Sequence, residues 1–327
     1  MSFESKKPLR TWSHLAEMRK KPSEYDIVSR KLHYSTNNPD APWELSPDCA
    51  MNLWYKQYRN ASPLQHDDWD AFTDPDQLVY RTYNMMQDGQ ETHVQSLFDQ
   101  FNEREHDKMI EPGWQTTLAQ CYSPLRYLFH CLQISSAYVQ QMAPASTISN
   151  CCILQTADSL RWLTHTAYRT HELSLTYPDA GFGDQERQIW EQESGWQGLR
   201  ELMERQLITF DWGEAFVSLN LVVKPTIMES VLKPLQTLAR ENNDTLLPLL
   251  IDSQLKDAER HNRWAKVLVQ HAYSNPDNQA VIAKWVDKWQ PFADQAAKQY
   301  LAMLSSDSDA AHYLDSSASL RASLLAA

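Results

Sequence analysis

The chain contains two related five-residue stretches, Asp158-Ser159-Leu160-Arg161-Trp162 and Asp257-Ala258-Glu259-Arg260-His261. We call them the Asp158 box and the Asp257 box. In each box an aspartate precedes an arginine by three positions, and residues at that spacing share one face of an α-helix. The boxes therefore predict two long helices with equivalent polar faces, about a hundred positions apart along the chain.

Helical bundles that hold two bridged irons carry a Glu-x-x-His pair on each of two helices and a single Glu on each of two others. A frequent form of this motif reads Asp-Glu-x-Arg-His. Against that pattern Ser159 and Ala258 occupy the glutamate positions and Trp162 occupies one histidine position, so that only His261 matches. We interpret the boxes as a di-iron motif that has lost its ligands, with Trp162 as core filler and His261 as a hydrogen-bonded interior histidine.

The upstream helices also lack the expected lone carboxylates. No Asp or Glu occurs from Pro112 to Ala157, and alignment on the local pattern Thr209-Phe210-Asp211-Trp212 places Gly213 at the second ligand position. Ferrous iron needs several anionic oxygen ligands, so we predict no metal, cofactor or catalytic residue on this chain. The Asp-x-x-Arg pairs either tie helices together or form exposed pairs within one helix.

The composition excludes several other classes of protein. The 327 residues suffice for one large helical domain, and the net charge of -12 disfavours nucleic acid or an anionic membrane surface as a partner. Only 7 glycines are present, without a phosphate-binding or nucleophile-elbow motif. Five cysteines without CxxC spacing, no apolar signal region and no apolar run near the ~18 residues of a membrane span predict a cytoplasmic protein with reduced thiols.

Prolines and apolar periodicity divide the chain into three regions. We predict an extended arm rich in proline and aromatics over 1–74, a helical bundle over 75–304, and a Ser/Ala-rich C-terminal segment over 305–327 that forms a weakly ordered helix or tail. In the arm we expect short helices at 12–20 and 48–59 and a short strand from Tyr25 to Tyr34. Thr73-Asp74-Pro75 reads as the start of the first bundle helix, and Glu103 and His106 as part of its solvated end.

The length, the arm and the two altered boxes together resemble the hydroxylase beta subunits of bacterial multicomponent di-iron monooxygenases of the toluene type. The resemblance implies an all-α, ferritin-like bundle related to ribonucleotide reductase, and a structural role. It implies an alpha subunit that holds the di-iron centre, a small gamma subunit, an (alpha beta gamma)2 assembly, and an effector protein, a Rieske ferredoxin and an NADH reductase. We expect Trp12, Trp43, Trp54 and Tyr58 of the arm to lie on the alpha subunit.

Two other functions remain open from the residues. The chain could be an independent ferritin-like oxidase, which would contain stoichiometric iron when isolated. It could instead be a free-standing helical module that binds a small apolar ligand in the space left by the missing metals.

Overall fold

A computed structural model describes residues 13–15, 18, 20–33, 46–304 and 307–326. Within these ranges every regular element is a helix, as the all-α prediction requires. Trp12 and Trp43 lie outside the described residues, so their predicted role at an interface stays a prediction.

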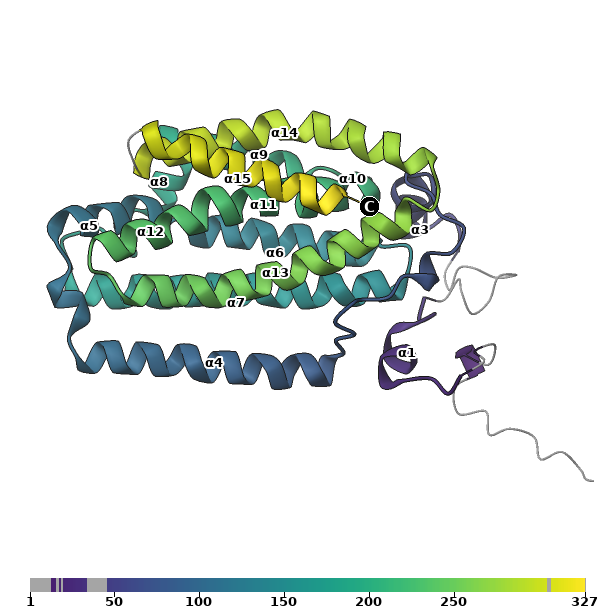
Figure 1. The fold of residues 1–327 in the computed structure, drawn as a ribbon, viewed down its shortest axis with the longest axis horizontal. Coiled ribbons are helices and arrows are strands. Elements are labelled where there is room, and N and C mark those ends of the chain that lie inside the picture. Colours follow the sequence, from purple (N-terminus) through teal and green to yellow (C-terminus); the bar gives the residue numbers. More distant parts are fainter. Residues whose placement is uncertain (1–12, 16–17, 19, 34–45, 305–306, 327) are drawn as a thin grey trace, which may run out of the picture.

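Four long segments form the centre of the bundle (Figure 1). They are α6 (Leu125–Met142), α7 (Ser146–Thr176), α13 (Leu246–Ala272) and a continuous central segment, Trp212–Glu241. The central segment consists of α10 (Trp212–Val217), η6 (Ser218–Val223), α11 (Lys224–Ile227), η7 (Met228–Leu232) and α12 (Lys233–Glu241). It is long and apolar enough to cross a membrane, but its most apolar stretch is entirely buried in the bundle, as expected of a core helix.

Further helices cover the outside of this centre. Helix α4 (Tyr80–Glu103) packs on α13. Helices α9 (Ser194–Leu207) and α14 (Asp277–Leu304) pack on each other and on the central segment, and α9 also packs on α6. Helix α15 (Asp307–Leu325) packs on α13, α14 and the central segment. The shorter elements are η1 (Ser13–Leu15), α1 (Glu24–Ser29), α3 (Ala50–Tyr55), η2 (Lys56–Asn60), η3 (Trp69–Ala71), η4 (His106–Met109), α5 (Pro112–Thr117), η5 (Leu118–Tyr122) and α8 (Glu186–Gln192).

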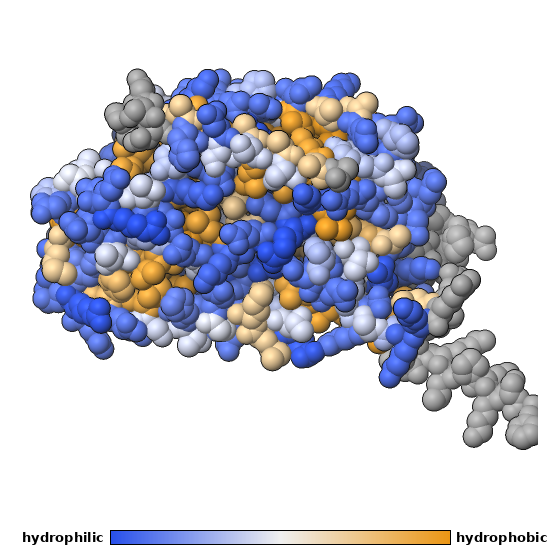
Figure 2. All heavy atoms as spheres, viewed as in Figure 1, coloured by the Kyte–Doolittle hydropathy of each residue, from blue (hydrophilic) through white to orange (hydrophobic). Residues whose placement is uncertain are grey.

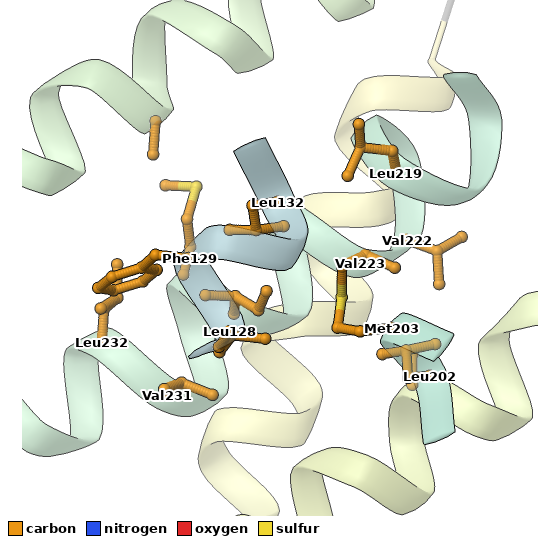
Figure 3. Close-up of a cluster of buried hydrophobic side chains, with 14 of the residues drawn as sticks. Leu128, Phe129, Leu132, Leu202, Met203, Leu219, Val222, Val223, Val231 and Leu232 are labelled. Carbon is orange, nitrogen blue, oxygen red and sulfur yellow. The ribbon is translucent and has the colours of Figure 1, made fainter. Parts of the chain in front are cut away.

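The main core lies between α6, α9 and the central segment. Figure 3 shows Leu128 and Leu132 of α6 close to Val223 and Val231 of the central segment, with Met203 of α9 beside them. All five side chains are almost fully buried. Burial of one such side chain contributes about 1.5–3 kcal/mol, so this apolar contact holds α6, α9 and the central segment together.

Prolines modify the central segment without ending it. A π-helical turn directly precedes α11 and another directly precedes α12, and each of these helices has a proline, Pro225 or Pro234, in its first turn. Proline lacks the N–H that an α-helix needs, and a wide π turn relieves the resulting mismatch. The backbone therefore continues through both prolines as one helix.

Two local predictions for the N-terminal region were wrong. The predicted strand from Tyr25 is helix α1, because Ser23 and Asp26 form a reciprocal capping box at its start. The Thr73-Asp74-Pro75 signal marks a turn, and α4 begins later, at Tyr80. The Asp74 carboxylate accepts hydrogen bonds from the backbone N–H groups of residues 76 and 78, at 3.0 and 3.2 Å, so it caps the turn and not the helix.

The C-terminal segment is helical over most of its length. Helix α15 places Ser317, Arg321 and Leu324 in buried positions against the bundle. Arg321 donates to Asp294 of α14 at 2.8 Å. The segment therefore closes one side of the bundle.

Candidate functional site: a buried polar network in place of a metal centre

The two boxes face each other across the α7–α13 contact, and their ion pairs cross between the helices. Arg260 of α13 binds the Asp158 carboxylate of α7, and Arg161 of α7 binds the Asp257 carboxylate of α13 at 3.0 Å. Within a single helix, Arg161 lies 3.6 Å from Asp158, and Arg260 lies 3.2 Å from Asp257. Both aspartates are buried, so the boxes tie two helices together and do not form exposed pairs.

Helix α4 supplies the remaining donors to the two aspartates. The Tyr83 hydroxyl donates to Asp158 Oδ1 at 2.8 Å. The Gln87 amide donates to Asp158 Oδ1 at 2.7 Å and to Asp257 Oδ1 at 2.9 Å. Burial, reinforced by the Asp158 charge, raises the pKa of Tyr83, which keeps its hydroxyl protonated as a donor. One side chain, Gln87, thereby links both boxes to a third helix.

Glu91, also on α4, extends the network toward the surface. Its carboxylate accepts from Arg161 Nε at 2.6 Å and lies 3.0 Å from His165 Nε2. Burial alone would raise the pKa of Glu91, but the hydrogen bonds and charges of His165 and Arg161 lower it to about 2. Glu91 is therefore an anion that balances the charge of Arg161.

The central segment contributes Lys224, which sequence reasoning missed. Its Nζ contacts His261 Nδ1, and His261 Nε2 lies 2.7 Å from Asp158 Oδ2. Burial lowers the pKa of Lys224 well below its usual range, and burial together with the neighbouring Lys224 and Arg260 lowers the pKa of His261. A neutral His261 that donates from Nε2 to Asp158 leaves Nδ1 as the acceptor for a lysine N–H.

The other predicted ligand positions hold no metal-binding group. The Ser159 hydroxyl donates to the Gln155 carbonyl of its own helix at 3.0 Å. The Trp162 indole donates to Asp257 Oδ2 at 3.1 Å, and its ring packs edge-on against Phe129 with centroids 5.6 Å apart. Ala258 is fully buried and offers only a methyl group.

Little space is left between these side chains. The remaining gap is too narrow for a water molecule. It is lined by Leu132, Trp162, Lys224, Ile227, Met228, Leu232 and Ala258. Side chains therefore occupy the volume in which a metal pair or a small apolar ligand would have to lie.

The predicted ligand position at Gly213 was wrong. A Cβ atom at Gly213 would lie 2.8 Å from Leu64 Cβ and 3.1 Å from Ser62 Oγ, so this residue contacts the 62–64 segment and not the boxes. The pattern used for the alignment is a helix start, since Asp211 accepts the Glu214 N–H at 2.9 Å as N-cap. The sequence could instead have pointed to Lys224 as the contribution of this segment to the site. Lys224 is a cation within an apolar run, and a buried cation requires a polar partner.

A second buried cluster lies beyond the end of α4, where we predicted a solvated surface. His106 and Asp107 are buried. His106 Nε2 lies 3.2 Å from the Asp244 carboxylate, and Arg169 binds Asp107. The prediction for His106 was wrong because sequence alone did not reveal these two partners, which lie on distant segments.

The described part of the arm packs on its own bundle. The Trp54 indole donates to the Tyr138 hydroxyl at 3.0 Å, and the rings of Trp54 and Tyr58 lie 4.9 and 5.6 Å from the ring of Phe210. Both arm residues keep partial exposure. Their predicted contact with a partner stays a prediction, and their buried parts belong to this chain.

The residues present do not fit a di-iron centre. Every carboxylate oxygen of Asp158 and Asp257 already accepts from Arg, His, Gln, Tyr or Trp donors. The central segment contributes the Lys224 amine, which contacts His261, the histidine that would have to bind the metal. In the ranges that the structure covers, no three His, Cys, Asp or Glu side chains are arranged to hold a metal ion.

Comparisons with known proteins agree with this fold. Residues 54–276 match the family of methane/phenol/alkene hydroxylases. The chain is 82% identical over 325 residues, 99% of both chains, to the beta subunit of the hydroxylase component of the toluene-4-monooxygenase system of Ectopseudomonas mendocina. It is 24% identical over 266 residues, 80% of this chain and 76% of the relative, to an oxygenase component of phenol 2-monooxygenase from Acinetobacter pittii.

Two solved structures have a fold similar to that of this chain. A chain from toluene 4-monooxygenase with toluene bound in the resting active site aligns with a TM-score of 0.88 at 82% identity, over 93% of this chain and 100% of that chain. Phenol hydroxylase from Pseudomonas sp. OX1 aligns with a TM-score of 0.80 at 20% identity, over 99% of this chain and 95% of that chain. The second likeness supports the fold alone.

Proposed function

This chain belongs to the methane/phenol/alkene hydroxylase family, and we propose that it is the non-catalytic beta subunit of the hydroxylase component of an NADH-dependent, toluene-type aromatic monooxygenase. Its role is structural: it packs against an alpha subunit that holds the di-iron centre and keeps the iron-bearing helices in position. No step of oxygen insertion takes place on this chain.

One observation carries the proposal: the polar network between the two boxes. In a functional di-iron bundle the inward-facing residues of these helices are metal ligands. Here Ser159, Trp162 and Ala258 stand at the ligand positions. The helices are held together by Arg–Asp pairs that cross between them and by the Lys224–His261–Asp158 contact. A bundle rebuilt in this way keeps its shape without metals, which is what a permanent structural subunit requires.

The partners follow from the family resemblance. We propose an (alpha beta gamma)2 hydroxylase, served by an effector protein, a Rieske ferredoxin and an NADH reductase in the cytoplasm. A role in holding alpha is physically reasonable, since reacting groups must be held to within about half an ångström of their productive geometry.

The test compares the isolated full chain with the assembled hydroxylase. The full chain is purified alone from iron-rich medium and also after co-expression with the alpha and gamma subunits, and iron per chain is measured in both preparations. We expect less than about 0.1 iron atom per isolated chain, because the carboxylate oxygens between the boxes already accept hydrogen bonds and cannot serve as iron ligands. We expect toluene hydroxylation only in the assembly. Stoichiometric iron in the isolated chain would refute the proposal in favour of an independent oxidase.

The same preparation tests the binding-module alternative. Titration of the isolated chain with toluene, followed by tryptophan fluorescence and calorimetry, is expected to give no saturable binding, because the space beside Trp162 is closed. Stoichiometric binding without partners would support a free-standing module instead.

A further inference from the structure

The segment before α4 packs on the end of the bundle where α13 is followed by α14 (Figure 1). Two almost fully buried apolar side chains, Leu64 and Phe72, fix its two ends. Between them, the Gln65 N–H donates to Asn278 Oδ1 at 3.2 Å, and the Asn278 amide donates to the Gln65 carbonyl at 2.8 Å. Residues 65–71, which we call the 65–71 loop, therefore lie on the bundle through hydrogen bonds between two apolar anchors.

Two histidines lie at the centre of this contact. The ring of His66, in the 65–71 loop, and the ring of His271, in the last turn of α13, have centroids 4.0 Å apart and planes tilted by 33°. The ring of Trp69 lies next to both, with its centroid 5.1 Å from that of His66 and 5.9 Å from that of His271. The two imidazoles are thus in direct contact between the loop and the helix.

Hydrogen bonds hold His66 in its neutral form. Its Nδ1 accepts the Asp68 N–H at 2.9 Å, so the ring proton is on Nε2, which donates to Ser274 Oγ at 2.7 Å. The Ser274 hydroxyl in turn donates to the His271 carbonyl at 2.8 Å. A protonated imidazole has no acceptor atom, so protonation of His66 breaks its bond to the backbone of the loop.

His271 is also favoured as a neutral side chain. Its Nε2 donates to the Asp68 carbonyl at 2.9 Å. Burial lowers the pKa of His271; the hydrogen bond to Asp68 opposes this shift, the neighbouring His66 adds to it, and the Asp68 charge opposes it. The Asp68 carboxylate itself accepts the Ala71 N–H at 3.1 Å, and Asp67 is exposed. Acid would therefore bring two positive rings together with one partly engaged carboxylate beside them.

The other elements that pack on the loop present uncharged groups to it. The Asn275 amide, just before α14, donates to the loop backbone at 2.9 Å. The Trp212 ring of the central segment meets the Trp69 ring edge-on at 5.1 Å. The Asp70 carboxylate interacts with Arg30 of the arm. These groups do not compensate a second positive charge on the histidine pair.

We propose that the His66–His271 contact is an acid-sensitive switch: it holds the 65–71 loop on α13 while both imidazoles are neutral, and the loop opens locally when they take up protons from solvent. Leu64 and Phe72 stay buried, so the opening is confined to the loop. The inference rests on contacts within this chain and is independent of the proposed function.

Opening of the loop acts on the start of the central segment. Trp69 leaves Trp212, the first residue of α10, which is almost fully buried in the closed form. Figure 2 shows hydrophilic side chains over most of the surface in that view, with apolar side chains in separate, smaller patches. An uncovered Trp212 would add an apolar site to such a surface.

The direction of the pH dependence follows from proton binding. A histidine in the open loop has a pKa of about 6.5, whereas the closed loop disfavours the charged form. The open form therefore binds more protons. The closed form is fully favoured above pH of about 6.5 and loses stability as the pH falls below that value.

The experiment measures amide hydrogen exchange by mass spectrometry in the full chain at pH 7.5 and pH 5.0. Protection is expressed relative to the exchange rate of an unstructured chain at the same pH, which removes the pH dependence of the exchange chemistry. We expect protection in peptides that cover 65–71 to fall about three- to thirtyfold at pH 5.0. The upper figure is the full effect of one histidine whose pKa in the open loop is about 6.5.

Two substitutions remove the titrating groups and keep their hydrogen bonds. In His66→Asn the side-chain carbonyl can accept the N–H two residues later, as in an Asx-turn, and in His271→Gln the amide can donate to the Asp68 carbonyl. We expect the double variant to lose less than about twofold of its protection between the two pH values. His93→Asn is the matched control, because His93 is exposed on α4, and it should keep the full pH effect.

Three results would overturn the proposal. Equal protection of the 65–71 loop at both pH values in the unsubstituted chain refutes it, and this result needs no variant. A full pH effect in a folded double variant would assign the effect to carboxylates of the loop such as Asp68. An equal loss of protection in peptides from α6 and α7 would show that acid unfolds the whole bundle and not the loop alone.

Discussion

Lys224 Nζ lies against His261 Nδ1, although both side chains are almost completely buried. The contact joins the central segment to α13 at the place where a metal-binding bundle would hold a carboxylate and a histidine on one ion. Burial favours the uncharged forms of both groups, and a neutral amine and a neutral imidazole can share one hydrogen bond. This arrangement has measurable consequences.

Replacement of Lys224 by Met should remove a pH dependence of stability. The pKa of Lys224 is lowered in the folded chain, so between that pKa and about 10.4, the value for an unfolded chain, only the unfolded state binds the proton. The free energy of unfolding should then rise with pH by up to about 1.4 kcal/mol per unit relative to Lys224→Met. Urea unfolding between pH 7.5 and 10 measures the difference.

Exposed Lys256 provides the control for that experiment. Lys256→Met should leave the pH profile of the unsubstituted chain in place, because an exposed amine has nearly the same surroundings in both states. Parallel profiles for Lys224→Met and the unsubstituted chain would mean that Lys224 is charged when folded.

Loss of Arg260 should destabilise the chain strongly. Arg260→Met leaves the buried Asp158 carboxylate without its cross-helix cation, and breaking a buried pair by removing one partner costs about 3–5 kcal/mol. Arg263 lies on the same helix as Arg260 and forms a half-exposed pair with Asp76, which precedes α4. The matched change Arg263→Met removes this pair and should cost at most about 1 kcal/mol. Equal effects of the two changes in denaturant unfolding would argue against a tightly packed network.

The contact between α9 and α14 depends on Gly198. A Cβ atom there would lie 2.7 Å from Ala296 Cα, so Gly198→Ala must push two helix backbones apart and should cost about 1–3 kcal/mol. Gly89 in α4 has no neighbouring atom within 4 Å of an added Cβ, and Gly89→Ala should stabilise the chain by about 0.5–1 kcal/mol. Melting temperatures of the two variants should therefore move in opposite directions.

The sequence predicted the fold well because its strongest signals are local and repeated. The two boxes correctly predicted two long helices, α7 and α13, and Pro112, Pro144 and Pro276 each lie at or next to a helix boundary. These signals depend on helical spacing and on backbone restrictions of proline, both of which act within a few residues.

The details of the site could not be predicted in the same way. Lys224 is separated from His261 by 37 positions, and His106 from Asp244 by 138, so each pair meets only through the tertiary fold. Cap residues also misled local reading: Asp74 and Asp211 both bind backbone N–H groups, one in a turn and one at a helix start. An aspartate binds unpaired backbone N–H groups in both settings, so the residue type alone does not distinguish a turn from a helix start.

Side chains of this chain occupy the space between the two boxes in which a di-iron bundle holds its metals. Anomalous scattering at the iron absorption edge, from crystals of the assembled hydroxylase, tests this most directly. We expect iron peaks in the alpha subunit and no peak between the Asp158 box and the Asp257 box, where Lys224 and Trp162 lie. A pair of iron peaks between these boxes would contradict the account.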